Sequence, residues 1–252
     1  MKLLQTVVSA EGFRNEASNR DRLGLLKELV RLCTREEARL LLVPAGFLTA
    51  PSEDDVPALI GEVNRLATAD RVAVIGGVDV EGRISKQGVN INDLVSRSEL
   101  PFLGFAVGPV ALPVDSGHPW RQTSVSSNNA DLVPNEAIPG QERVATIDGF
   151  RVGVLICGEL FSWRARRGLA QAGVGLVADV GHVGMGQGLI PAMKNVAKEG
   201  QCCVAHSQHL SGWYGRALHF MDARGEQLSA DVDQAHFVEH GSLWAAWAAR
   251  EV

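Results

Sequence analysis

The amino-acid sequence predicts an α/β protein with a single domain. Buried apolar runs typical of strands alternate with stretches whose apolar residues recur at helical spacing, and this alternation occurs twice in similar order. No linker or low-complexity tract divides the 252 residues. With 46% hydrophobic residues, a chain of this length can bury one sizeable core.

The first half of the chain is predicted to begin with two strand–helix units. The first helix carries Leu23, Leu26 and Cys33 on one face. Pro57 is tolerated only in the first turn of the second helix, so Asp55 is its expected N-cap. The expected strands cover residues 3–9, 39–44, 71–80, 89–95 and 102–105, and the expected helices cover 16–33 and a segment from just before Pro57 to Leu66.

The second half follows a long segment rich in Pro, Ser and Asn, residues 108–141, of the kind that serves a site or an interface. Asp148-Gly149 between two β-runs indicates a hairpin. The expected strands cover residues 144–147, 151–156, 174–180, 201–206 and 216–222, with others near Gln227 and His236. The expected helices cover 160–172, 189–199 and 242–250, and the expected loops cover 181–188 and 208–215.

Cys157 lies between the buried strand 151–156 and the following helix. This position places its sulfur on a tight turn at the end of the sheet, as in a nucleophile elbow. The neighbouring helix N-terminus favours the thiolate, which is the nucleophilic form. The alternative is that Cys157 is a small buried hydrophobic residue, as most free cysteines are.

The segment Gly149–Phe161, with its Gly-x-x-Val-Gly-Val-x-Ile-Cys-x-acid pattern, and the later Gly173–Val177 resemble the nitrilase or carbon–nitrogen hydrolase superfamily. The resemblance covers nearly the whole chain. It implies a four-layer α-β-β-α sandwich in which residues 1–252 form one hydrolase-like domain. It also implies a cysteine that attacks an amide or nitrile carbon, with a glutamate as base and a lysine that stabilises the tetrahedral intermediate.

Two of these three catalytic positions differ here. The family glutamate follows a Pro at the end of the second strand, where this chain has Ala45. The family lysine position corresponds to Asn129, and no lysine occurs between Lys86 and Lys194. Glu136 corresponds to a second family carboxylate, or is a solvated loop acid.

The third position, Cys157, is retained, and Glu159 stands where the resemblance implies an acid. The backbone N–H of Gly158 is expected to point toward an oxyanion. His182 and His206 end the two strands after the nucleophile strand, so either could replace the lost base. The alternative for each is a hydrogen-bonded structural histidine.

The composition of the chain limits the kinds of molecule that it is expected to bind. A net charge of −5 does not suggest nucleic-acid or acidic-membrane binding. No apolar run spans a bilayer, and the four cysteines show no zinc spacing, so a cytoplasmic protein without metal or cofactor is expected. The resemblance implies a small-molecule ligand or substrate and a homodimer or higher homo-oligomer.

Two hypotheses follow. In the first, the protein has a degenerate triad, lacks ordinary amidase activity and binds a small ligand or partner, because losing a general base costs roughly 10²–10⁴-fold in rate. In the second, it remains a thiol hydrolase acting on a C–N bond, with Cys157 served by His182 or His206.

Overall fold

The structure is a computed structural model that describes residues 1–80, 102–123, 140–183, 186–210 and 216–252. The predicted strand 89–95 lies outside the described residues. The α-helices are α1 (Asn19–Arg35), α2 (Val56–Ala69), α5 (Trp163–Ala172) and α6 (Leu189–Gly200), and the 3-10 helices are η1 (Glu16–Ser18), η2 (Glu53–Asp55), η4 (Gln141–Arg143), η5 (Cys157–Phe161), η6 (Gly186–Gly188) and η8 (Val232–Gln234). The strands are β1 (Lys2–Ser9), β2 (Leu40–Leu42), β3 (Leu48–Ala50), β4 (Ala73–Val80), β5 (Phe102–Val107), β6 (Trp120–Arg121), β7 (Val144–Ile147), β8 (Phe150–Ile156), β9 (Leu176–Val183), β10 (Cys203–Leu210), β11 (Ala217–Leu218), β12 (Phe220–Met221), β13 (Ala230–Asp231), β14 (His236–His240) and β15 (Leu243–Glu251).

Strand β1 lies where the strands divide into two halves. It pairs in parallel with β2 over residues 3–5 and with β10 over residues 7–9, and it pairs antiparallel with β15. One half then runs β2-β4-β5-β6 and the other runs β10-β9-β8-β7. The Thr6 hydroxyl donates to the Leu42 carbonyl, and the Ser207 hydroxyl donates to the Thr6 carbonyl. These two bonds tie the halves together at the point where they diverge.

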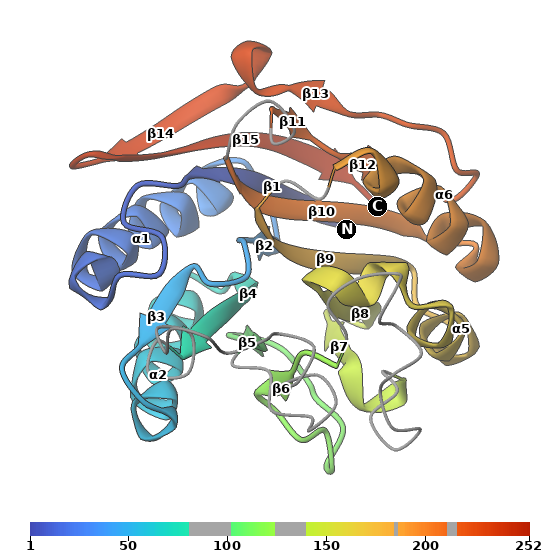
Figure 1. Cartoon of the computed structure of the whole chain (residues 1–252), viewed down its shortest axis with the longest axis horizontal. Helices are drawn as coiled ribbons and strands as arrows, with labels where there is room; N and C mark the ends of the chain where they lie inside the picture. The colour runs from blue at the N-terminus through green and yellow to red at the C-terminus, as the bar shows by residue number, and fades with distance from the viewer. Residues whose placement is uncertain (81–101, 124–139, 184–185, 211–215) are drawn as a thin grey trace, which may run out of the picture.

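The two halves face one another (Figure 1), and a layer of buried apolar side chains lies between them. Leu42 and Ile75 contribute to this layer from one half, and Val154 and Ala178 contribute from the other. Helices α1 and α2 cover the outer face of the first half, and α5 and α6 cover the outer face of the second. The predicted four-layer α-β-β-α sandwich is therefore confirmed.

The predicted C-terminal helix, residues 242–250, is wrong: this segment is strand β15. It pairs with β1 on one side and β14 on the other, and its buried residues satisfy a period of two as well as a helical spacing. Trp247 stacks on His236 across this β14–β15 pair, with ring centroids 4.9 Å apart.

Two predicted loops are also partly strand. β9 continues to Val183 and β10 continues to Leu210, which places His182 and His209 within regular structure. The predicted helix 160–172 is divided, because the Ser162 hydroxyl accepts a hydrogen bond from Ala165 N and caps α5 separately from η5. Among the described residues, no helix is long and apolar enough to cross a membrane.

Candidate active site

Cys157 occupies the predicted tight turn at the end of β8. Its φ of 49° is left-handed, which a residue with a side chain rarely adopts, and it is half-buried. Such a conformation costs about 1–3 kcal/mol and persists only where the surrounding structure imposes it. The turn and the strain together match a nucleophile elbow.

Glu159 holds this turn in place. Its buried carboxylate accepts a hydrogen bond from Ile156 N at 2.8 Å and forms a two-point ion pair with Arg143, at 2.6 and 3.0 Å. It also accepts from the backbone N and the hydroxyl of Thr123. Glu159 is therefore fully engaged in fixing the residue before Cys157, and its carboxylate is used structurally.

His182 reaches the site from β9 and meets Asp79 from β4. Val180 lies two residues before His182, and Ile75 lies four residues before Asp79. Both belong to the apolar layer between the two halves, and because side chains an even number of residues apart on a strand share a face, His182 and Asp79 also lie on inner faces. Asp79 Oδ1 lies 2.9 Å from His182 Nε2, and both side chains are almost fully buried. His182 also forms a side-chain hydrogen bond with Cys157. The three residues form a Cys–His–Asp series that spans both halves of the sandwich.

Asp79 has a second partner, Arg14, whose Nε donates to Asp79 Oδ2 at 3.0 Å. The Arg14 guanidinium lies over the rings of Phe13 and Phe102, at 4.9 and 5.1 Å. The same two rings contact the imidazole of His182, with centroids 6.3 and 4.4 Å away.

These contacts set the charges of the pair. Burial on its own would lower the pKa of His182, but the charges of Asp79 and Cys157 and hydrogen bonds to both raise that pKa to about 10. Burial likewise opposes ionisation of Asp79, yet His182 and Arg14 hold its pKa below the ordinary carboxyl value. At neutral pH the pair is thus an imidazolium beside a carboxylate.

Ala45, which the resemblance places at the position of the family glutamate, contacts the residue before His182 through its backbone. Its N–H donates to the carbonyl of Gly181 at 3.1 Å, and its own carbonyl lies 3.2 Å from His209 Nε2. Gly46 follows with a φ of 61°, and a Cβ there would lie 2.7 Å from Asp79 Oδ2. Glycine is therefore required for the chain to pass so close to the carboxylate.

His206 does not belong to this series. Its neighbour Ala205 belongs to the inner layer, so His206 lies on the opposite face of β10. There its Nδ1 lies 2.5 Å from Asp179 and its Nε2 lies 3.1 Å from Gln208. The structure brings His182 to Cys157 and pairs His206 with a different carboxylate.

Asn129 and Glu136 lie outside the described residues. Sequence reasoning missed Asp79, Arg14 and the two phenylalanines. One signal was available for Asp79, because it is a lone acid within the apolar run 72–80 and a buried acid needs a partner.

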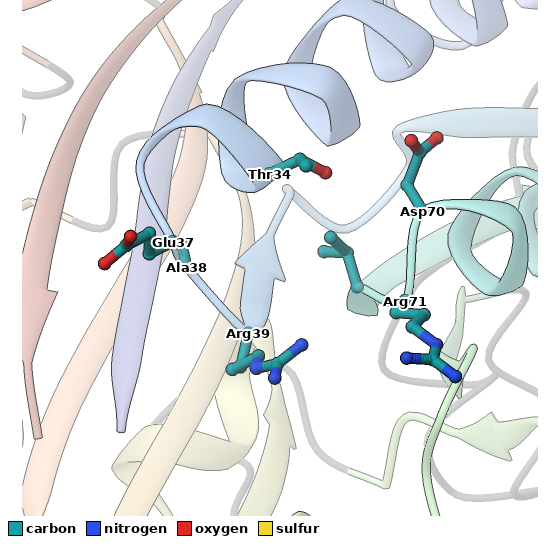
Figure 2. Close-up of a pocket in the computed structure, with 7 residues that line it drawn as sticks. Thr34, Glu37, Ala38, Arg39, Asp70 and Arg71 are labelled. Carbon is teal, nitrogen blue, oxygen red and sulfur yellow. The ribbon is translucent and has the colours of Figure 1, made fainter.

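A separate pocket of about 400 Å³ lies at the other ends of the strands (Figure 2). It is formed where α1 and α2 end and β2 and β4 begin. Arg39 and Arg71 border it, and Arg39 pairs with the exposed Asp148 at 3.5 Å. Its lining contains neither a cysteine nor a histidine, so this pocket is distinct from the Cys157–His182–Asp79 series. In the described part of the chain, no group of three or more His, Cys, Asp or Glu side chains is placed to hold a metal ion.

The fold and this site define the class of protein that the chain resembles, the carbon–nitrogen hydrolases with an α-β-β-α sandwich. No family model matches the chain, and no curated protein matches its sequence. Solved structures do match. An amidase from Nesterenkonia sp. superposes with a TM-score of 0.64 at 16% identity, covering 98% of this chain and 90% of that one.

Two further structures of the Nesterenkonia amidase match similarly. A glutamate-to-glutamine variant showing Michael addition of acrylamide at the active-site cysteine has a TM-score of 0.64 at 16% identity, covering 98% of this chain and 92% of that one. A cysteine-to-alanine variant in complex with butyramide has a TM-score of 0.63 at 16% identity, covering 98% and 90%. Another structure of this amidase is described as from the nitrilase superfamily. At this identity the comparisons establish that the chain has the nitrilase-superfamily fold.

Proposed function

We propose that the protein is a thiol hydrolase of small amides in which His182 and Asp79 serve Cys157. The observation that carries this proposal is the Cys157–His182–Asp79 series, with a 2.9 Å contact between the imidazole and the carboxylate. Cysteine-based acyl transfer needs a nucleophile, a second group that moves the proton of the nucleophile, and a third group that orients the second. The amidase fold favours an amide as the substrate.

The first half of the reaction forms an acyl-enzyme. The Cys157 thiolate attacks the amide carbon, and a C–S bond forms while the carbonyl electron pair moves to oxygen. When that pair returns, the C–N bond breaks, and the amine leaves with the proton that the His182 imidazolium donates. His182 Nε2 is engaged by Asp79, so Nδ1 is the ring nitrogen assigned to this transfer.

The second half regenerates the cysteine. Neutral His182 takes a proton from water, the water oxygen bonds to the acyl carbon, and the C–S bond breaks to release a carboxylic acid. The backbone N–H of Gly158 is the proposed oxyanion donor in both halves, because it directly follows the nucleophile. A lysine is not assigned to this role, since residues 87–193 contain none.

The base has moved within the sandwich on this proposal. Ala45 is hydrogen-bonded through its backbone to Gly181, the residue before His182, so the segment at the position implied for the family acid is in contact with the segment that carries the imidazole. The buried Ala45 methyl also supports the second candidate, a protein that keeps the fold and a ligand site without ordinary amidase activity. The partners of His182 favour the hydrolase, because a vestigial site has no need to maintain a buried imidazolium–carboxylate pair.

A cytoplasmic homo-oligomer acting on a small molecule remains part of the proposal. The four cysteines are free, as is usual for a protein of a reducing compartment.

The decisive experiment uses a panel of short aliphatic amides and nitriles with four proteins: wild type, Cys157→Ala, His182→Gln and His206→Gln. We expect ammonia release by wild type, none by Cys157→Ala, and a loss of roughly 10²–10⁴-fold in His182→Gln. His206→Gln alters the other aspartate-paired histidine and should retain most of the activity, with circular dichroism confirming that each variant is folded.

Alkylation of Cys157 by iodoacetamide gives a second readout. We expect the folded protein to react faster than the urea-unfolded chain, and His182→Gln to remove that advantage. The hydrolase would be refuted by alkylation no faster than in the unfolded chain together with no turnover on the panel, an outcome that would support the ligand-binding candidate.

A further inference from the structure

Arg14 lies beside the proposed active site with part of its guanidinium unused. Its Nε is engaged by Asp79, and in the part of the chain that the structure describes neither of its Nη atoms donates a hydrogen bond. Its side chain is 34% exposed, whereas that of Asp79 is 1% exposed. The Arg14 side chain therefore extends from the buried Asp79–His182 pair toward the surface of the protein.

The side chain of Arg14 is held in one orientation. Its guanidinium lies 4.9 Å from the Phe13 ring centroid and 5.1 Å from that of Phe102, and both rings also contact His182. A planar guanidinium that is stacked and anchored through Nε loses little further freedom when its Nη atoms bind a ligand. These are the requirements of a preorganised binding group for a carboxylate.

The charges of the described residues favour an anion at this place. Three cations, Arg14, the buried Arg22 and protonated His182, accompany two anions, Asp79 and the proposed Cys157 thiolate. Glu159 and Asp179 do not change this balance, because Arg143 pairs with the first and His206 pairs with the second. One more negative charge would complete the site, and a neutral amide does not bring it.

We propose that Arg14 binds a carboxylate of the substrate, so that the substrates are short monoamides of dicarboxylic acids. This inference rests on the proposed hydrolase function. Cys157 receives the amide end, and the Nη atoms of Arg14 receive the carboxylate end. Asp79 lies between Arg14 and His182 and sets the distance between the two ends of the substrate.

The test compares succinamate with its neutral isostere 4-oxopentanamide, in wild type, Arg14→Gln and Arg14→Lys. We expect kcat/KM of wild type to favour succinamate by at least about tenfold, the size of one charge-assisted hydrogen bond. Arg14→Gln should remove this preference and Arg14→Lys should restore part of it. Because Arg14 also contacts Asp79, the ratio between the two substrates is the informative quantity, since a general loss of activity cancels in it.

Binding is measured separately by calorimetry of succinamate with Cys157→Ala and with the double variant Cys157→Ala/Arg14→Gln. We expect the double variant to bind at least about tenfold more weakly. If wild type hydrolyses both amides equally, or if Arg14→Gln slows both to the same extent, Arg14 only positions Asp79 and the inference is overturned while the hydrolase stands. If succinamate binds through Arg14 but is never cleaved, the hydrolase fails while Arg14 remains a carboxylate-binding residue.

Discussion

Asp79 Oδ1 and His182 Nε2 are 2.9 Å apart although 103 residues separate them in the chain, and they belong to opposite halves of the sandwich. The contact links the two layers at the end where Cys157 lies. Any change in the spacing of the two sheets would therefore also change the orientation of the imidazole toward the sulfur. The proposed chemistry therefore depends on how the two sheets pack.

The first prediction concerns Asp79→Asn and the pH dependence of amide hydrolysis. With His182 as proton donor, activity is lost as pH rises through its pKa of about 10. Removing the carboxylate removes the main cause that raises this pKa, and burial then lowers it toward or below the ordinary 6.5. The fall of kcat/KM at high pH, the basic limb of its pH profile, should therefore begin several pH units lower. The exposed Asp148→Asn should leave the limb in place, and an unchanged limb in Asp79→Asn would exclude His182 as the acid.

The second prediction distinguishes a displaced base from a lost one. If Ala45 marks a vestigial site, Ala45→Glu should raise amide hydrolysis. On the proposed arrangement it should lower activity at least about tenfold, because a side chain added at this 1% exposed position brings a second carboxylate near His182 and competes with Asp79 for it. Initial rates on the amide panel decide between the two. Ala45→Ser, which adds little volume and no charge, is the matched control and should retain most of the activity.

Local signals in the sequence, which are buried strands, amphipathic helices and the Asp148-Gly149 hairpin, were sufficient to predict an α/β protein and the turn at Cys157. The four-layer sandwich was predicted only through the family resemblance of residues 149–161. The sequence did not distinguish His182 from His206, because both strands are buried on both faces and their apolar residues show no alternation. The choice between the two histidines depends on which face meets the opposite sheet.

The partners of His182 could not be predicted for a related reason. Asp79 and Arg14 come from distant segments, and only the packing of the two halves brings them together. The C-terminal strand was missed because Ala and Trp residues at positions 244–249 fit a helical spacing, and pairing with β1 determines their conformation.

The third prediction concerns the turn that presents Cys157. Glu159→Gln weakens the buried pair with Arg143, whose side chain is 5% exposed, and leaves that cation without its compensating charge. Breaking a buried pair from one side typically costs about 3–5 kcal/mol. Urea unfolding should show a loss of this order. Glu199→Gln, in the more exposed pair with Arg166, is the control and should cost less than about 1 kcal/mol. Equal losses in the two variants would contradict the role assigned to Glu159.

The last prediction concerns stability against acid. Burial, with the nearby charge of Arg22, lowers the pKa of His209 from the ordinary 6.5 to about 3. Below pH 6.5 the unfolded chain therefore takes up a proton that folded His209 cannot accept, and stability falls as pH decreases toward 3. One such group changes the free energy of unfolding by at most about 1.4 kcal/mol per pH unit.

His209→Gln can keep the hydrogen bond to the Ala45 carbonyl and cannot titrate. Between pH 7 and pH 5, its free energy of unfolding should therefore fall less steeply than that of wild type, measured by urea titration at each pH. His219, whose pKa burial lowers to about 4, contributes a term of the same sign. The double variant His209→Gln/His219→Gln should flatten the curve further, and curves parallel to wild type would show that neither histidine makes the fold sensitive to acid.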